Sequence, residues 1–412
     1  MKRAYRIIPC YAGDVSGAAS ALYELGGMVV IHDPSGCNST YNTHDETRWY
    51  KRDSLIYISG LKRSDALMGN DKAFIRDVTE AAAELGPRFI ALCSSPIPWI
   101  NGTDFEALAG LIEGETGLPT FAVRTNGMHD YTRGVGRALT AYAAKMLPKV
   151  GRGDTGKSVD IKPDSPIRVV IVGLTPLDFP DPATVEDLKA RLEAEGFSVI
   201  ASWAMGTGPQ ELLRTPMADV SLVVSAGGLE IARYLEKIYG IPYVAGLPVG
   251  DFSSFLFETL RKKGEESRKK KQAGVGLSRE TLTQSLTAYG QCLAQDLTEE
   301  EMAEKAEASG LVIAAEPVLA GSLKAAIFRK DGLLAKVLLP LEESKSLLLP
   351  GDCVTEGEED MEKAFSKARY IIGDPLYRPI CPGEADFYPL PHQAFSGRMF
   401  KGERKDPLTL EI

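Results

Sequence analysis

A chain of 412 residues is too long for a single hydrophobic core, so we expect two or three domains. Its hydrophobic fraction of 44% and charged fraction of 25% are typical of a soluble globular protein. The net charge of −9 argues against nucleic-acid binding, which needs a basic surface, and no apolar stretch is long enough to span a bilayer. We therefore expect a cytoplasmic protein that binds neither nucleic acid nor membrane.

Strands and helices alternate through residues 1–150. The sequence predicts helices over 17–25 (with Ser16 as N-cap), 71–85, 104–116 and 131–147, and strands ending at Ile31 and over 55–58, 89–92 and 118–123. Because this order joins parallel strands through helices, it predicts the α/β fold class, with a mainly parallel sheet flanked by helices.

Two further stretches repeat this plan. In the first we predict helices over 182–195, 229–239 and 252–263 and strands over 168–173, 199–201, 220–225 and 240–244. In the second we predict helices over 279–295, 299–309 and 358–368 and strands over 311–314, 332–339 and 370–373. A Gly/Pro-rich linker over 151–166 and a basic stretch near 269–276 separate the units. The predicted bounds are 1–150, 166–270 and 277–412.

Three local patterns have weaker interpretations. Residues 151–158 formally match a phosphate-binding loop, but they follow a helix and enter a polar segment, whereas such a loop joins a strand to a helix. The basic run between Arg261 and Lys271 is interpreted as a solvated helix end or loop. The turn at 225–228, before a helix, is either an anion-binding turn or a tight turn without a ligand.

Cysteines follow three apolar runs of the first unit, at Cys10, Cys37 and Cys93. Ligands of α/β proteins bind at the carboxyl ends of strands, and thiols stay reduced in the cytosol, so metal ligation or redox chemistry is indicated. Converging thiolates suit an iron–sulfur cluster, whose fourth ligand would come from a partner subunit or from Asp14. The alternative is that these are ordinary buried cysteines.

Zinc is a weaker interpretation, because zinc ligands usually occur in pairs at short spacing and none is present. His32 and His44 lie on either side of Cys37 and are interpreted as hydrogen-bonded loop residues rather than ligands.

The motifs at 10–13, 31–37, 59–69 and 93–104, followed by 231–242 and 391–397, resemble nitrogenase component 1 over essentially the whole chain. That superfamily includes molybdenum–iron protein subunits, their cofactor-assembly homologues, the dark-operative protochlorophyllide reductase and the nickel-sirohydrochlorin reductase. The most specific motif is the turn ending in Cys37. The resemblance implies three Rossmann-like domains, a [4Fe–4S]-type cluster at a subunit interface, and electrons from a separate ATP-dependent iron protein.

The resemblance assigns Cys10 and Cys37 to the first two cluster ligands. The third falls on Ser95, two residues after Cys93, so either Cys93 or Ser95 would complete the set. The cysteine and histidine that hold the nitrogenase cofactor fall at about Ser225 and Gly383, so both ligands are missing here and dinitrogen reduction is not expected.

Two residues near the C-terminus are candidates for catalysis. Cys381 lies close to the position of the lost histidine and would approach a substrate, or is a structural or exposed thiol. His392 would donate a proton to a substrate, or only packs.

Three functions remain open. The first is a reductase subunit, in a homodimer or a paralogous heterodimer, that passes low-potential electrons to a small organic or tetrapyrrole-like substrate in the cleft between the domains. The second is a non-catalytic carrier for metallocluster or cofactor assembly. The third is a cluster-free protein that binds a small ligand. The displaced third cysteine favours the third function, and the presence of Cys10 and Cys37 speaks against it.

Overall fold

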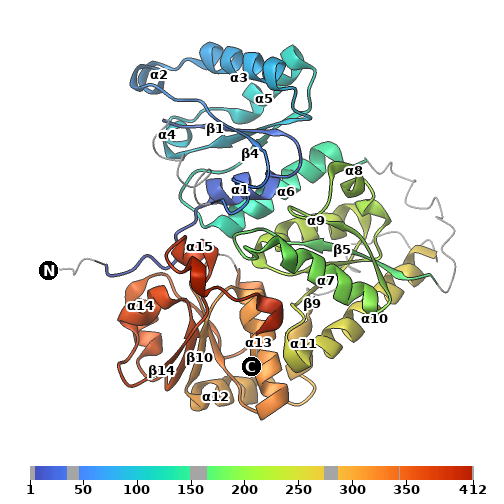
Figure 1. Cartoon of the computed structure of the whole chain (residues 1–412), viewed down its shortest axis with the longest axis vertical. Helices are drawn as coiled ribbons and strands as arrows, with labels where there is room; N and C mark the ends of the chain where they lie inside the picture. Colours follow the sequence, from blue (N-terminus) through green and yellow to red (C-terminus); the bar gives the residue numbers. More distant parts are fainter. Residues whose placement is uncertain (1–4, 35–45, 149–164, 273–285, 343, 411–412) are drawn as a thin grey trace.

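The computed structural model describes residues 5–34, 46–148, 165–272, 286–342 and 344–410. Within them the strands form three sheets, one after another along the chain, and all neighbouring strands of these sheets are parallel. Figure 1 shows helices around each sheet. The predicted fold class, three Rossmann-like α/β units, is therefore confirmed.

The first sheet has the strand order β2-β1-β3-β4. Its strands are β1 (Met28–His32), β2 (Leu55–Ile58), β3 (Ile90–Ser94) and β4 (Thr120–Val123). Its helices are α1 (Asp14–Leu22), α2 (Arg63–Met68), α3 (Asp71–Leu85), α4 (Pro96–Ile100), α5 (Phe105–Thr116) and α6 (Tyr131–Met146). Alternate residues of β1 enter different cores: Val30 packs with the residues of α3 and α5, and Val29 with those of α1 and α6.

The second sheet has the order β6-β5-β7-β8-β9. Its strands are β5 (Ile167–Val172), β6 (Phe197–Ser202), β7 (Val220–Val223), β8 (Tyr243–Ala245) and β9 (Leu286–Thr287). The helices are α7 (Pro182–Ala194), α8 (Pro209–Leu212), α9 (Leu229–Tyr239) and α10 (Ser253–Gln272), with short 3-10 helices η2 (Thr215–Met217), η3 (Ala226–Gly228) and η4 (Gly250–Phe252).

The third sheet has the order β12-β11-β10-β13-β14. Its strands are β10 (Leu311–Ala314), β11 (Lys336–Leu339), β12 (Cys353–Val354), β13 (Tyr370–Gly373) and β14 (Asp386–Pro389). The α-helices are α11 (Ala288–Leu293), α12 (Glu299–Ser309), α13 (Pro317–Asp331), α14 (Glu358–Phe365) and α15 (Gln393–Ser396). The 3-10 helices are η6 (Ser344–Leu347), η7 (Pro375–Ile380), η8 (Lys401–Glu403) and η9 (Pro407–Thr409).

Some sequence predictions are wrong in detail. Helix α1 begins at Asp14 with Gly13 as its N-cap, so Ser16 lies inside the helix. Part of the helix predicted over 279–295 is strand β9, because Val244 and Ala245 of β8 recruit Leu286 and Thr287 as an edge strand. The sequence patterns also gave no indication of α13 and β14. The formal phosphate-loop match at 151–158 lies outside the described residues.

The basic run is also not wholly solvated. It lies at the end of α10, where the guanidinium of Arg268 is buried and donates from Nε to Asp219 Oδ2 at 2.9 Å. Arg168 on β5 donates to the same carboxylate, from Nη2 to Oδ1 at 2.8 Å. These contacts fasten the end of α10 to the amino edge of the second sheet.

Close helix packing joins the first sheet to the rest of the molecule. Helices α1 and α6 cross so tightly that a Cβ added at Gly134 would lie 1.8 Å from the carbonyl oxygen of Asp14. A Cβ at Gly17 would lie 2.1 Å from the carbonyl oxygen of Tyr131. Only glycine permits this approach, which brings the start of α1 beside the start of α6. One hydrophobic cluster extends from these helices through the second and third units.

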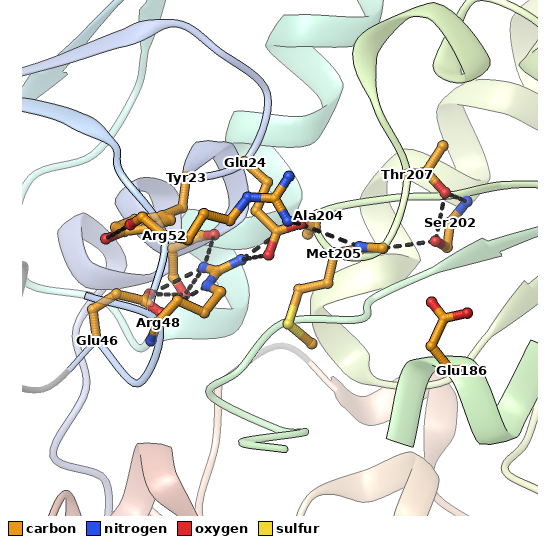
Figure 2. A network of polar contacts seen from close by, with 12 residues as sticks. Tyr23, Glu24, Glu46, Arg48, Arg52, Glu186, Ser202, Ala204, Met205 and Thr207 are labelled. Carbon is orange, nitrogen blue, oxygen red and sulfur yellow. Dashed lines mark hydrogen bonds and ion pairs between the residues drawn. The ribbon is translucent and has the colours of Figure 1, made fainter. Parts of the chain in front are cut away.

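A buried ionic network also joins the first unit to the second (Figure 2). The Arg48 guanidinium donates to Glu46 Oε1 at 2.7 Å and to Glu24 Oε1 at 3.1 Å, and it reaches the carbonyl oxygen of Ala204 at 3.4 Å. The amide of Gly206 donates to the other oxygen of Glu24 at 3.2 Å. Because every charge has a partner of opposite sign, the network can be buried without stranding an ion.

The N-terminal segment crosses the third unit before it enters α1, as Figure 1 shows. Arg6 forms ion pairs with Glu358 and Glu362 of α14, each at 2.7 Å. The amide of Tyr11 then donates to the carbonyl oxygen of Ala394 at 3.0 Å. The residues around Cys10 therefore lie between the first and third units.

None of the helices in the described part of the chain combines the length and the apolar character that crossing a membrane requires.

Candidate functional site

Cys10 lies in the N-terminal segment that contacts the third unit, three residues before the N-cap of α1. Its thiol is partly buried, with Sγ 3.5 Å from the carbonyl oxygen of Ala394 and 3.6 Å from that of Ala12. Burial raises the pKa of this thiol well above its ordinary value, and the negative charges of Asp130 and Asp178 raise it further. A thiolate at Cys10 therefore needs a cation, which a metal would supply.

Cys93 occupies a different environment. It lies inside β3, which extends to Ser94, and it pairs in register with Ile31 of β1. The side chain is fully buried in the core under α1 and α6. Burial raises its pKa to about 12, and the nearby charge of Asp14 adds to the effect. These surroundings are those of a structural thiol.

Ser95 lies at the corner itself, as the N-cap residue of α4. Its hydroxyl is buried and donates to the carbonyl oxygen of His32 at 2.9 Å. The His32 imidazole is in turn held by the hydroxyl of Ser59, with Nδ1 to Oγ at 2.7 Å, and packs on Phe74. Burial lowers the pKa of His32 to about 4, so the ring is neutral near pH 7.

Cys37 and His44 lie outside the described residues, so their predicted positions stay predictions. Asp14, the proposed extra ligand, has both carboxylate oxygens engaged: the amides of Asn126 and Gly127 donate to them at 2.9 and 2.8 Å. Burial raises the pKa of Asp14, against the effect of these two hydrogen bonds.

His392 lies at the N-cap of α15, where the three units meet. Its Nδ1 accepts a hydrogen bond from the amide of Ala394 at 3.3 Å, and its Nε2 lies 3.4 Å from Oδ1 of Asp178. The backbone amide of His392 donates to Asp374 at 2.7 Å. The ring packs on Phe395, with 4.3 Å between the ring centroids. Contacts on both sides therefore hold the imidazole in one orientation.

Cys381 follows η7, and its thiol donates to the carbonyl oxygen of Tyr377 at 3.2 Å. Burial raises the pKa of Cys381 to about 11. The hydroxyl of Tyr377 donates to the carbonyl oxygen of Pro9 at 2.7 Å. Cys381 is thus connected, through one tyrosine, to the backbone beside Cys10.

We call the region around His392, where the three units meet, the junction. The sequence analysis did not find three of its residues, Tyr131, Asp178 and Glu316. Asp178 follows β5 and accepts a hydrogen bond from the hydroxyl of Tyr131 at 2.5 Å and one from Thr175 at 3.1 Å. Glu316 follows β10 and is the N-cap residue of α13. Asp178 and Glu316 follow the carboxyl ends of strands, the signal that identified the cysteines, and a search for carboxylates there would have found them.

Glu316 also decides between the two interpretations of the turn at 225–228. Its Oε1 accepts from the amide of Ala226 at 2.7 Å and its Oε2 from the amide of Leu319 at 2.9 Å. The group that accepts a hydrogen bond from this turn is therefore a side chain of the protein, the carboxyl of Glu316. Burial raises the pKa of Glu316 to about 8, and the charge of Asp178 adds to this effect.

A metal-binding set is incomplete in the described part of the chain, where no three His, Cys, Asp or Glu side chains are arranged to hold an ion. The chemistry of Cys10 suits a cluster, since its thiol lies between two units and its hydrogen bonds to the carbonyl oxygens of Ala12 and Ala394 are long contacts. Cys93, which is enclosed by apolar side chains, does not fit equally well.

The three parallel sheets, each flanked by helices, place the chain among the α/β proteins. The comparisons with known proteins identify its family. Residues 14–335 match the family described as nitrogenase component 1 type oxidoreductase. The chain belongs to this family, and the resemblance inferred from its motifs is confirmed.

Several curated relatives are similar to the chain. The nitrogenase iron-molybdenum cofactor biosynthesis protein NifE of Clostridium pasteurianum is 26% identical over 307 residues, which cover 68% of this chain and 62% of that protein. A subunit of the light-independent protochlorophyllide reductase of Zygnema circumcarinatum is 25% identical over 54% of this chain and 43% of that protein. The nitrogenase molybdenum-iron protein alpha chain of Methanosarcina barkeri is 19% identical over 52% and 40%. The chain spans less than two thirds of the length of these relatives.

A solved structure titled nitrogenase Cp1 at pH 6.5 has the same fold. It superposes with a TM-score of 0.62 at 16% sequence identity, over 96% of this chain and 88% of that one. At this identity the match supports the fold and not the activity.

Proposed function

We propose that this chain is a reductase subunit of the nitrogenase-like kind. An iron–sulfur cluster, most simply [4Fe–4S], would pass low-potential electrons from a separate ATP-dependent iron protein to a small organic or tetrapyrrole-like substrate. The observation that carries the proposal is the position of Cys10. Its thiol lies beside the junction that holds His392 and Asp178, so an electron-carrying ligand and a proton-donating group share one region.

Cys10 and Cys37 would hold the cluster, with Cys93 or Ser95 as the third ligand, and the remaining position would be filled by the partner subunit or by Asp14. Of the two candidates for the third ligand, Ser95 lies at the strand corner, and Cys93 lies in the core. When bound, the cluster supplies single electrons at low potential. The residues of the junction hold and deliver the protons that a two-electron reduction also needs.

We propose an organic substrate rather than dinitrogen, on chemical grounds. Ser225 is fully buried and donates to the carbonyl oxygen of Gly173 at 2.8 Å, and Gly383 has no side chain. Neither position offers the thiolate or imidazole that would hold a molybdenum-containing cofactor in the nitrogenase manner.

Partner proteins would bind at the first unit. Helices α2 and α4 expose large apolar side chains, among them Met68 at 86%, Leu67 at 75% and Ile100 at 69%. The side-chain amide of Asn101 donates to the carbonyl oxygen of Ala66 at 2.7 Å and fastens the two helices together. An exposed apolar surface of this kind is typical of a protein–protein interface. It supports an identical or paralogous subunit, or the iron protein, as the occupant.

A carrier in metallocluster assembly is the second candidate. The observation in its favour is the match to NifE, which is named for cofactor biosynthesis and covers more of this chain than the reductase relative does. A cluster-free protein that binds a small ligand is the third candidate, and the burial of Cys93 favours it.

The first experiment is to measure iron and acid-labile sulfide in protein purified without oxygen. About two irons per chain indicate one four-iron cluster shared by two subunits, and about four indicate one cluster per chain. We expect Cys10→Ala and Cys37→Ala to lose the iron. Cys353→Ala, a partly buried cysteine on β12, is the matched control and should keep it. Comparing Cys93→Ala with Ser95→Ala identifies the third ligand. Absence of iron even after reconstitution would contradict the proposal.

A second experiment separates a reductase from a carrier. The loaded protein is mixed with a cognate iron protein and MgATP, and the oxidation state of the cluster is followed by electron paramagnetic resonance. A reductase should be reduced and keep its iron through repeated cycles. A carrier should instead release its iron-containing group to an acceptor protein.

A further inference from the structure

The carboxylate of Asp178 is the point at which groups from all three units meet. Asp178 belongs to the second unit, Tyr131 begins α6 of the first, and His392 precedes α15 in the third. All three residues are at least nine-tenths buried. A buried carboxylate without a cationic partner is costly, so its neighbours need an explanation.

Each neighbour contacts a defined oxygen of Asp178. The hydroxyl of Tyr131 donates to Oδ1 at 2.5 Å and that of Thr175 to Oδ2 at 3.1 Å. Nε2 of His392 lies 3.4 Å from Oδ1. The carboxyl of Glu316 and the thiol of Cys10 lie nearby. No lysine or arginine forms an ion pair with Asp178 among the described residues.

The hydrogen bonds of His392 fix the place of its proton. Because Nδ1 accepts from the amide of Ala394, a neutral imidazole carries its proton on Nε2, which faces Asp178. A second proton gives the ring a positive charge. Among the described residues, Asp178 is the only carboxylate that forms an ion pair with this ring. An aspartate in this relation to a histidine orients the ring and stabilises its protonated form.

We propose that Asp178 is the positioning residue of His392 and that Tyr131 holds Asp178 in place for this role. His392 then takes a proton from water at Nδ1, with loss of the hydrogen bond from Ala394, and gives that proton to the substrate once the substrate has gained electrons. The charge of the ring is balanced meanwhile by Asp178. This inference rests on the proposed function, because such a histidine is of use only where a substrate is reduced.

The test is the Nε2–H signal of His392 in proton–nitrogen spectra of ¹⁵N-histidine-labelled protein, recorded in mildly alkaline buffer. The chain has only four histidines, so loss of one signal in His392→Gln assigns it. In the wild type we expect a slowly exchanging proton, because Nε2 is buried and lies 3.4 Å from Oδ1 of Asp178.

Asp178→Asn should move this signal upfield and speed its exchange with water, because an amide oxygen is a weaker acceptor than a carboxylate. Tyr131→Phe should move it further downfield, because Oδ1 then has one donor fewer. Thr175→Val is the matched control: it removes a hydrogen bond to the other oxygen, and the signal should stay nearly unchanged.

A His392 signal that is absent in the wild type, or that is unchanged in both Asp178→Asn and Tyr131→Phe, overturns the proposal. If Asp178→Asn does not fold, the shift in Tyr131→Phe alone decides. None of these spectra needs iron or substrate. If the protein binds no iron, the proposed function is contradicted. The spectra still test whether Asp178 positions His392.

Discussion

The second sheet has one buried aspartate at the amino ends of its strands (the amino edge) and one at their carboxyl ends (the carboxyl edge). The two aspartates have opposite surroundings. Asp219 precedes β7 at the amino edge and contacts Arg168 and Arg268. Asp178 follows β5 at the carboxyl edge, where its partners are a tyrosine, a threonine and a histidine, with Glu316 nearby. One edge is neutralised by permanent cations, and the other keeps a negative charge that only protons can balance.

The comparison of Asp219 with Asp178 distinguishes a carboxylate that stabilises the fold from one whose surroundings suit proton transfer. Burial by itself would raise the pKa of Asp219, but hydrogen bonds from Arg168 and Arg268 outweigh it and lower that pKa. Burial raises the pKa of Glu316, and hydrogen bonds from backbone amides, among them those of Ala226 and Leu319, oppose this only in part. Parallel sheets place ligand sites at their carboxyl edges, so groups with movable protons are expected at Asp178 and not at Asp219.

The largest expected effect is that of Asp219→Asn. The substitution leaves the buried Arg268 and the partly buried Arg168 without their anion, which should lower the free energy of unfolding by about 3–5 kcal/mol. Urea unfolding followed by circular dichroism measures the change. Asp77→Asn, which breaks an exposed ion pair with Arg76, is the control and should cost almost nothing. A loss below about 1 kcal/mol for Asp219→Asn would show that the amino edge does not depend on this pair.

Glu316→Gln should change how stability depends on pH. The pKa of Glu316 is about 8 in the folded chain, against an ordinary value of 4.5. The folded chain therefore binds the proton of this carboxyl more tightly than the unfolded chain does. As a result, the free energy of unfolding should fall as the pH rises from about 4.5 through about 8. A glutamine does not ionise. Relative to the wild type, the variant should gain at least about 1.4 kcal/mol between about pH 5 and pH 9, the equivalent of one pKa unit.

Unfolding curves at several pH values measure this difference. If the stabilities of the two proteins run parallel over that range, Glu316 has an ordinary pKa and the carboxyl edge holds no extra proton.

Asp178→Asn should cost about 1 kcal/mol or less in the free energy of unfolding at neutral pH. The amide oxygen still accepts from Tyr131, and no cation is stranded. Urea unfolding beside Asp219→Asn makes the comparison direct. A cost equal to that of Asp219→Asn would mean that both edges are structural, and the contrast between them would be lost.

The smallest effect is expected at the rim of the junction. His129 on the first unit lies with Nδ1 2.8 Å from Oε2 of Glu342 on the third, and their side chains are 25% and 43% exposed. His129→Gln should cost about 0.5 kcal/mol at most near pH 6, because water screens exposed pairs. The difference should vanish in about 1 M salt, where the Debye length is about 3 Å. A difference that persists in salt would indicate packing rather than charge.

The sequence predicted those elements whose signals are local. Helix α3 occupies the predicted residues, with the side chain of Asn70 accepting from Ala73 and Gly86 in the left-handed conformation at its end. Helix α12 likewise has a capping box of Thr298 and Glu301. These signals act within one turn of helix and do not depend on the rest of the fold.

Elements that depend on tertiary contacts were missed. Helix α13 is buried along its length from Pro317 to Ile327, so its sequence lacks the alternation of polar and apolar faces that identifies a surface helix. Strand β9 exists because β8 offers an edge. The predicted ligand Cys93 was assigned to a corner because β3 was expected to end at Leu92, but the strand continues to Ser94.

The candidate site was only partly predictable for the same reason. Cys10 and His392 could be selected by residue type, but the contact between the segments that carry them spans more than 380 residues of sequence. Nothing local to Asp178 distinguishes it from the exposed Asp181 three residues later. Their difference arises when Tyr131 and His392 fold against one of them.

The crossing of the N-terminal segment over the third unit has a consequence for biosynthesis. Cys10 precedes Ala394 by 384 residues, yet its thiol contacts the carbonyl oxygen of Ala394, and the hydroxyl of Tyr377 donates to the carbonyl oxygen of Pro9 beside it. At about 5–20 residues per second, ribosomes need roughly 20–80 seconds to reach that partner. The contacts around Cys10 can therefore form only after the third unit has been synthesised.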